Sequence, residues 1–238
     1  MHAHQNVQVT TTEHQVIAAF PTVGNAAFSA VERRVRDLCL RYADRLPFHG
    51  WHHVNFVRSK AAAFAAANGA DVSVVQTAAL VHDVNYLVRR NSPASAGRSL
   101  RMDVLAESGV DAETAKWIDE IVDEAEMCSR HRDISLEAQA LSDADTLFKA
   151  LPITPVMLAH RYLEENGLSL RALADKIVGE QSGIHDDGYY FYNPDAAATY
   201  SRWAMANLEL WRCIQESVAD PVVEDLLDAV AAVDAAAS

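Results

Sequence analysis

Residues 71–90 read DVSVVQTAALVHDVNYLVRR, and this stretch decides the fold class. Asp71 is a residue type that caps the first turn of a helix, and the residues after it are mostly apolar without a glycine or proline. The central run AALV is apolar on every side of a helix, which predicts that the helix is buried on all sides. Such a helix needs other helices packed around it, so the stretch indicates an all-α core.

Helical spacing of apolar residues continues from this stretch in both directions. The chain holds only 9 glycines and 7 prolines in 238 residues, and alanine occurs throughout. We therefore predict an all-α, single-domain helical bundle with a flexible arm at 1–24, a helical domain at 25–220 and a C-terminal helix or tail at 221–238. The predicted helices lie at 25–46, 51–68, 72–90, 95–109, 111–128, 135–150, 155–166, 169–183, 194–217 and 221–236.

Composition and charge exclude several classes of function. A formal net charge of −13 argues against a nucleic-acid polymer as partner. No stretch reaches the roughly 18 consecutive apolar residues of a membrane span. The three cysteines are far apart, and the first residues lack the basic start and apolar run of a signal peptide. We expect a reduced, cytoplasmic protein with no membrane partner, and a homodimer is left open.

The pair His82-Asp83 is the most informative feature of the buried helix. Burying an imidazole beside a carboxylate costs several kcal/mol unless the two are paired or bind a cation. A salt-bridged core pair is one alternative. The other is a metal site, which would draw further ligands from FHGWHH at 48–53 and LSDADTLFKALP at 141–152. Two imidazole nitrogens and two carboxylate oxygens suit one divalent ion such as Mn, Fe, Mg, Zn, Co or Ni.

The ordered pattern H…HD…D resembles the HD-domain superfamily of metal-dependent phosphohydrolases. The segments FHGWHH, AALVHDVNY and SDADTLFKA carry the resemblance, which extends over residues 25–165. It implies an HD-type helical domain with four metal ligands. His53 is preferred over His52 because an apolar residue, Val57, follows it by four positions. Asp145 is preferred over Asp143 because it lies in the family's Ala-Asp-x-Leu pattern. The implied ligands are His53, His82, Asp83 and Asp145.

His49 precedes His53 by four residues, so the two side chains face the same way in a helical segment. The spacing resembles the HNxxH stretch of cyclic-nucleotide phosphodiesterases, in which the first histidine donates a proton to the leaving group. This chain has Gly50 where those enzymes have asparagine. His49 is predicted either as the general acid or as a histidine without a chemical role. His52 points about 100° away and is expected to lie outside the ligand set.

A phosphate substrate also needs cations. We predict Arg98 and Lys149 as the first choices for substrate binding, followed by Arg89 and Arg101. The alternative for each is a solvated charge or a partner of a helix end. The acidic run DEIVDEAE at 119–126 is interpreted as a solvated helix face.

Two further segments have open interpretations. The aromatic run YYFY at 189–192 has three interpretations: it stacks on a ligand, it forms a lid, or it packs on the domain. His131 is the only histidine between residues 84 and 144, so extra ligands for a second metal are scarce and a mononuclear site is favoured.

The resemblance therefore implies a hydrolase that acts on a small phosphate ester or a nucleotide, with His49 and Asp83 as catalytic residues. The alternatives are a hydratase or di-iron oxygenase of the same superfamily, and a non-enzymatic module that binds a metal or ligand.

Overall fold

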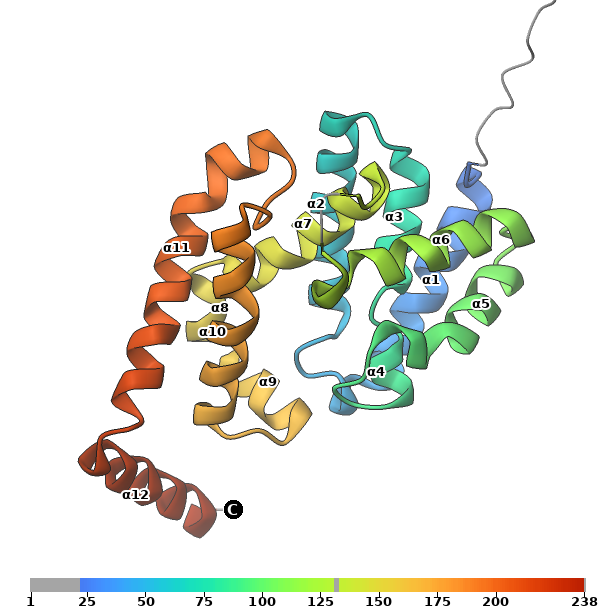
Figure 1. Ribbon diagram of the computed structural model, residues 1–238. Coiled ribbons are helices and arrows are strands. Elements are labelled where there is room, and N and C mark those ends of the chain that lie inside the picture. The colour runs from blue at the N-terminus through green and yellow to red at the C-terminus, as the bar shows by residue number, and fades with distance from the viewer. Residues whose placement is uncertain (1–21, 131–132, 238) are drawn as a thin grey trace, which may run out of the picture.

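Helices make up the fold in the computed structural model, which describes residues 22–130 and 133–237, and no strand occurs in that part of the chain (Figure 1). The predicted all-α class is confirmed. Most of the predicted arm at 1–24 lies outside the described residues. The α-helices are α1 (Asn25–Arg41), α2 (Trp51–Asn68), α3 (Val72–Val81), α4 (Asn85–Val88), α5 (Arg98–Glu107), α6 (Ala112–Ala125), α7 (Leu136–Ala150), α8 (Ile153–Met157), α9 (Ala159–Asn166), α10 (Leu170–Asp187), α11 (Pro194–Ser217) and α12 (Pro221–Ala237). The short 3₁₀ helices are η1 (Ala43–Arg45), η2 (Ala94–Gly97) and η3 (Met127–Ser129).

Helix α2 lies at the centre of the bundle and packs against both α3 and α7 (Figure 1). Its buried residues Val54, Val57, Ala61 and Phe64 recur at helical spacing, so one face of α2 points into the core. The run from Ala78 to Val81 in α3 is fully buried, as its all-apolar sequence predicts. This packing places the segments that carry the candidate ligands next to one another.

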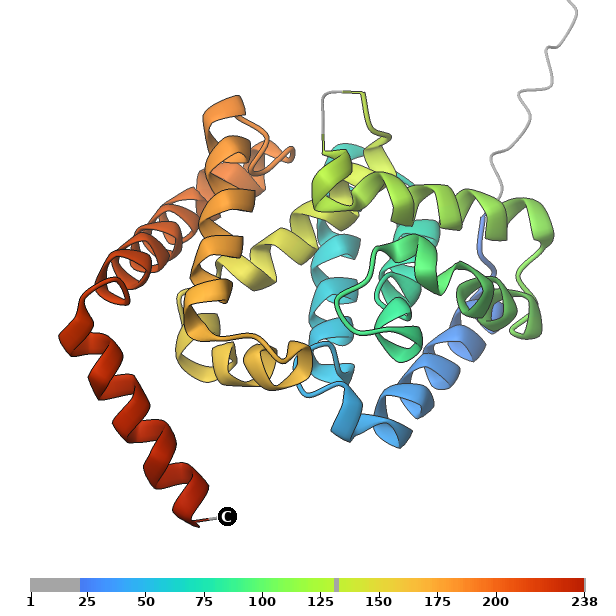
Figure 2. The same cartoon turned by 60° about the horizontal axis from the view of Figure 1, so that its bottom comes forward.

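Helices α10 and α11 pack together and flank the central helices (Figure 1). Helix α11 also contacts α7, which joins this pair to the bundle. Helix α12 extends away from the end of α11 in both views (Figure 2), and its Val222, Leu226 and Val230 side chains are exposed. No helix of the described residues is long and apolar enough to cross a membrane.

Side-chain caps fix several helix starts that the sequence predicts. Asp71 accepts hydrogen bonds from the backbone N–H groups of Ser73 and Val74, and Asp111 does the same for Glu113 and Thr114. These bonds satisfy donors that have no partner inside the helix.

The predicted helix at 72–90 is interrupted. Helix α3 ends at Val81, a turn follows over 82–84, and α4 begins at Asn85. The backbone hydrogen bonds of this turn span three residues instead of four, from Tyr86 N–H to Asp83 O and from Leu87 N–H to Val84 O. Elsewhere, the predicted helix at 155–166 is divided into α8 and α9, and α10 continues past residue 183 to Asp187.

Candidate metal centre

The adjacent residues His82 and Asp83 lie in the turn that follows α3. His82 Nε2 lies 3.0 Å from Asp83 Oδ2. Both side chains can therefore serve the same site.

His53 near the start of α2 and Asp145 on α7 complete the cluster. His53 Nε2 lies 3.2 Å from His82 Nε2, 2.8 Å from Asp83 Oδ2 and 3.6 Å from Asp145 Oδ1. Asp145 Oδ1 is also 4.0 Å from His82 Nε2. The ligand atoms of His53, His82 and Asp145 all lie within 4.8 Å of one another, a spacing at which they could hold one metal ion. The four residues of the predicted ligand set thus come together from three segments.

The hydrogen bonds around the cluster fit a metal ion better than a salt-bridged core pair. His82 Nδ1 lies 2.8 Å from the carbonyl oxygen of Ala79 and donates its proton there, so Nε2 is the nitrogen that faces the cluster. Within the described residues, His53 Nδ1 and Asp83 Oδ2 are buried and have no hydrogen-bond partner, although Asp83 Oδ2 is close to both imidazoles. Asp83 Oδ2 and the two Nε2 atoms converge without satisfying one another, as a cation site requires, whereas His53 Nδ1 is on another edge of its ring and does not face the cluster.

The charges of the cluster agree with this assignment. Burial lowers the pKa of His53 to about 4, so its imidazole is neutral at neutral pH, the form that binds metals. Burial opposes ionisation of Asp83, but the neighbouring His82 outweighs it and holds the Asp83 pKa well below its usual value. Burial lowers the pKa of His82, but Asp83 and Asp145 outweigh it and the net pKa is raised. A bound cation would replace that proton, and two neutral imidazoles with ionised carboxylates form a donor set that fits a divalent cation of the first transition row or Mg²⁺.

Lys149 faces the same site from the next turn of α7. Its Nζ lies 2.6 Å from Asp145 Oδ2, while the other oxygen of Asp145 points to the histidines. Burial lowers the pKa of Lys149, but Asp145 outweighs that effect and the net pKa is raised, so the amine stays charged. Asp145 therefore offers a single oxygen to an ion, and Lys149 supplies a cation beside it.

His49 lies beside the cluster and is held by Glu165 on α9. The Nδ1 atom of His49 contacts Glu165 Oε1, and the backbone N–H groups of Phe48 and His49 donate to Glu165 Oε2 at 2.8 and 3.0 Å. Burial opposes ionisation of Glu165, yet these hydrogen bonds hold its pKa below the usual value. The His49 ring stacks on Tyr86 with 3.6 Å between centroids. With Nδ1 bound to Glu165, Nε2 is the nitrogen left for chemistry.

Gly50 fits this segment for a steric reason. A Cβ atom at position 50 would lie 2.7 Å from the carbonyl oxygen of Leu46. No larger residue fits unless the backbone moves, which explains why asparagine is absent from this position.

A cavity of about 340 Å³ opens onto the cluster. His49, His82, Asp83, Asp145 and Lys149 line it on one side. Residues of α10 and α11 line the other side, so the cavity lies between the central helices and the α10–α11 pair. A small molecule in this cavity would contact three of the candidate ligands together with Lys149, while His53 lies behind them.

Three of the four predicted substrate cations lie elsewhere. Arg98, Arg101 and Arg89 are absent from the cavity lining. Arg101 is completely buried and binds Asp119, Asp123 and the carbonyl oxygen of Ala94, and Arg98 binds the same two carboxylates. These arginines pair with acidic residues of α6, so the structure does not bring them to a substrate. Lys149 is the one predicted cation that it places in the cavity.

The acidic run at 119–126 is a solvated face only in part. Asp119 is buried against Arg101, Glu124 accepts hydrogen bonds from the backbone and side chain of Ser135, and Glu126 accepts one from the N–H of Ala94. These carboxylates join neighbouring elements, whereas Glu120 is exposed and pairs with Lys116 of the same helix.

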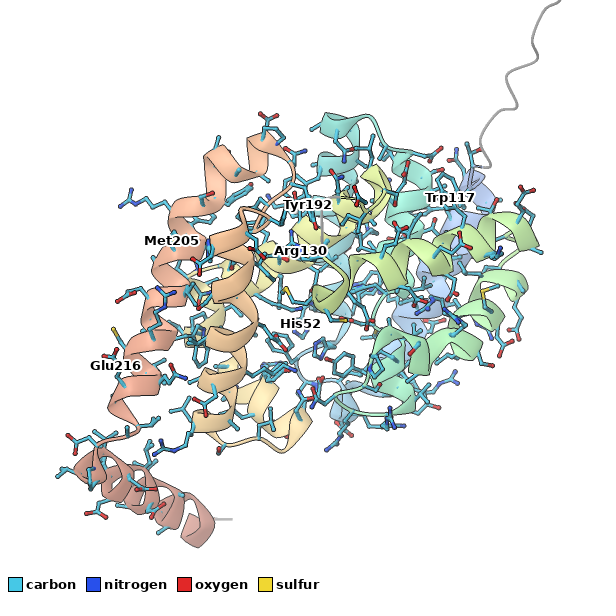
Figure 3. The ribbon with its side chains drawn as sticks, in the orientation of Figure 1. His52, Trp117, Arg130, Tyr192, Met205 and Glu216 are labelled. Atoms are coloured by element: carbon cyan, nitrogen blue, oxygen red, sulfur yellow. The ribbon has the colours of Figure 1, made fainter. Side chains whose placement is uncertain are left out.

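Asp143, the aspartate not chosen as a ligand, holds the aromatic segment in place. Its carboxylate accepts the backbone N–H groups of Tyr192 and Asn193 at 2.9 and 2.7 Å and pairs with Arg130 at 3.1 Å. Arg130 also lies over the Tyr192 ring, 4.8 Å from its centroid (Figure 3). Tyr190 and Phe191 are buried, and none of the four aromatic residues lines the cavity. The YYFY segment therefore packs on the domain and does not contact a ligand in this cavity. His131 and Arg132 lie outside the described residues.

Sequence reasoning missed Glu165 and placed His52 correctly outside the ligand set, where it is exposed (Figure 3). Glu165 is separated from His49 by 116 residues and lies in an ordinary polar helix, so no local signal marks it.

Comparison with known proteins gives limited information. No family model matches the chain, and no solved structure matches it. The chain is 34% identical over 105 residues to the uncharacterized protein YpgQ of Bacillus subtilis (strain 168). The aligned part covers 42% of this chain and 50% of YpgQ, so the chain spans half the length of that relative. YpgQ is itself uncharacterized and assigns no activity.

Proposed function

We propose that this protein is an HD-type, metal-dependent phosphohydrolase that acts on a small phosphate ester or nucleotide through one divalent ion. The observation that carries the proposal is the convergence of His53, His82, Asp83 and Asp145, the last three of which line a cavity. The order H…HD…D of these residues in the sequence supports the same class.

The four ligands would hold the ion, with Asp145 contributing one oxygen. When bound, a divalent ion supplies Lewis acidity to a phosphoryl oxygen and lowers the pKa of a water molecule. Asp83 lies between the two imidazoles, where its charge also orients water in the cavity.

Lys149 and His49 supply the remaining chemistry. The charged amine of Lys149 binds and orients the phosphate next to Asp145. His49 would deliver a proton to the leaving oxygen from Nε2, the ring nitrogen that Glu165 does not bind. Phe48 and Tyr162 pack around the His49 ring and limit the access of water to it.

The proposal is tested by measuring phosphate release from a panel of phosphate esters and nucleotides, with Mn²⁺, Mg²⁺, Co²⁺ or Ni²⁺ added to the metal-free protein. We expect wild-type activity that requires a metal and is lost in His53→Ala. His52→Ala is the matched control, because it removes an exposed histidine from the adjacent position. Metal-independent release, or equal activity in the two variants, would contradict the proposal.

The same preparations separate the alternatives. Consumption of dioxygen with two irons per chain favours an oxygenase, and hydration of a substrate without phosphate favours a hydratase. A tightly held metal without turnover of any substrate favours a non-enzymatic module. Within the described residues no second group of potential ligands adjoins the cluster, and this favours the mononuclear form.

A further inference from the structure

One face of α10 forms the wall of the cavity opposite the candidate ligands. The lining residues of this helix recur at intervals of three and four, which places them on one side of the helix. They are Leu173, Lys176, Ile177, Glu180 and Gln181. Trp211 of α11 lies on the same wall. The wall thus combines three apolar side chains with three polar ones, and such a combination can select a small molecule.

The two charges of this wall are already engaged. Lys176 lies 3.5 Å from Glu180 on the same helix and donates a hydrogen bond to Asn91 Oδ1 at 3.1 Å. Their opposite charges leave the wall neutral. An uncharged part of a ligand is therefore a better fit here than a second phosphate.

Gln181 has hydrogen-bond donors that the protein does not use. The residue is only 4% exposed, and its Oε1 accepts a hydrogen bond from the Tyr190 hydroxyl at 3.1 Å. No described atom accepts a hydrogen bond from its amide nitrogen. Because the oxygen is committed to Tyr190, the NH₂ group is the part of the amide left to bind a ligand in the cavity.

Tyr190 is itself firmly placed. It is buried, and its ring stacks on His185 with 3.8 Å between centroids. The aromatic segment therefore has an indirect connection to the cavity, since Tyr190 orients the amide of Gln181.

We infer that Gln181 selects the substrate by donating a hydrogen bond to an acceptor, a carbonyl oxygen or ring nitrogen, on the uncharged organic group that carries the phosphate. The inference rests on the proposed function for the phosphate end of the substrate. Tyr190 is a positioning residue for the amide. A site built to hydrogen-bond one group discriminates against an analogue that lacks it, because the buried donor is then left unpaired.

The test uses two aryl phosphates of similar shape, 4-acetylphenyl phosphate, which carries a carbonyl acceptor, and 4-isopropylphenyl phosphate, which does not. We expect Gln181→Leu to lower kcat/KM for the acetyl compound on the order of tenfold and to leave the isopropyl compound unchanged. Each variant is compared with wild type on the same compound, so the different leaving groups cancel. Tyr190→Phe should lower kcat/KM for the acetyl compound by a smaller factor.

Gln215→Leu is the matched control, because Gln215 is a glutamine of α11 that binds Asp175 and does not line the cavity. It should change neither compound. Equal effects of Gln181→Leu on both compounds, or no effect on either, would overturn the inference.

Calorimetric binding of both compounds separates this inference from the proposed function. If wild type releases no phosphate from either compound, the proposed function fails for these esters. The binding preference still decides the role of Gln181. Tighter binding of the acetyl compound that is lost in Gln181→Leu supports it, and equal affinities in wild type refute it.

Discussion

The protein contains two buried clusters of ionisable side chains that differ in how their charges are satisfied. Around Arg101, each guanidinium hydrogen bond ends on Asp119, Asp123 or a backbone carbonyl. Around His82, two imidazole nitrogens and two carboxylates point at one another, and buried atoms remain without hydrogen-bond partners among the described residues. The first cluster satisfies its charges without a ligand, whereas the second has the unsatisfied, converging atoms on which the proposed metal site rests. Burial of charge alone therefore does not indicate function.

The largest expected effect concerns the cluster around Arg101. Arg101→Met removes the buried partner of Asp119 and leaves only the exposed Arg98 beside it, which should lower the free energy of unfolding by about 3 kcal/mol. Denaturant unfolding of the metal-free protein measures this. Arg98→Met is the control, because the Arg98 side chain is 53% exposed and its loss should cost much less. A stable Arg101→Met protein would show that the network does not support the fold.

His49 and Glu165 form a third buried pair. Nδ1 of His49 is bound to Glu165, and His49 also lines the cavity. His49→Gln should lower kcat for phosphate release by about 100-fold, the lower range for general acid catalysis, and leave metal content unchanged. Glu165→Gln should lower kcat by a smaller factor, because the histidine remains but loses its charged partner. Steady-state kinetics with metal analysis checks both variants. An unchanged kcat in His49→Gln would assign the histidine a structural role.

The folded protein should become more stable when the cluster around His82 binds a metal ion. An ion at 100 times its Kd adds about 2.7 kcal/mol to the folded state, which corresponds to a Tm increase of roughly 5–10 °C for a chain of this size. We expect this increase with Mn²⁺ in wild type and its loss in His82→Ala, as measured by calorimetry. Arg98→Met should retain the increase, because its network does not bind the ion. An equal response of all three proteins would place the ion elsewhere.

The smallest expected effect concerns the cap of α6. Hydrogen bonds from Thr114 hold the pKa of Asp111 below its usual value of 3.8. The stabilisation from the ionised cap is therefore present above pH 3.8 and is lost as the pH falls through the lower value of the folded state. Asp111→Asn keeps a capping side chain that does not titrate, so the decline of Tm below pH 4 should be shallower than in wild type. Parallel profiles would contradict this.

The clustering of the four candidate ligands could be predicted from the sequence because each lies in a local pattern with a recognisable spacing. The choice of His53 over His52 agrees with the structure, in which one side chain is buried in the cluster and the other is exposed. Asp145 likewise joins the cluster, whereas Asp143 binds Arg130 and the segment before α11.

The remaining features depend on contacts between distant segments. Sequence periodicity cannot show that the helix stops at Val81, because apolar residues continue on both sides of the turn. In the sequence alone, Arg98 and Arg101 resemble phosphate-binding residues. Only the structure shows that Asp119 and Asp123 of α6 lie beside them. Glu165 is predictable only once α9 is known to lie against the segment of Phe48 and His49.

The most direct test of the central claim is the number of metal ions that each chain binds. Purified metal-free protein is dialysed against Mn²⁺, and the bound metal is measured by mass spectrometry for wild type, His82→Ala and His52→Ala. The account predicts one ion per chain in wild type and His52→Ala and none in His82→Ala. Equal metal content in wild type and His82→Ala, or no binding by wild type, would contradict it.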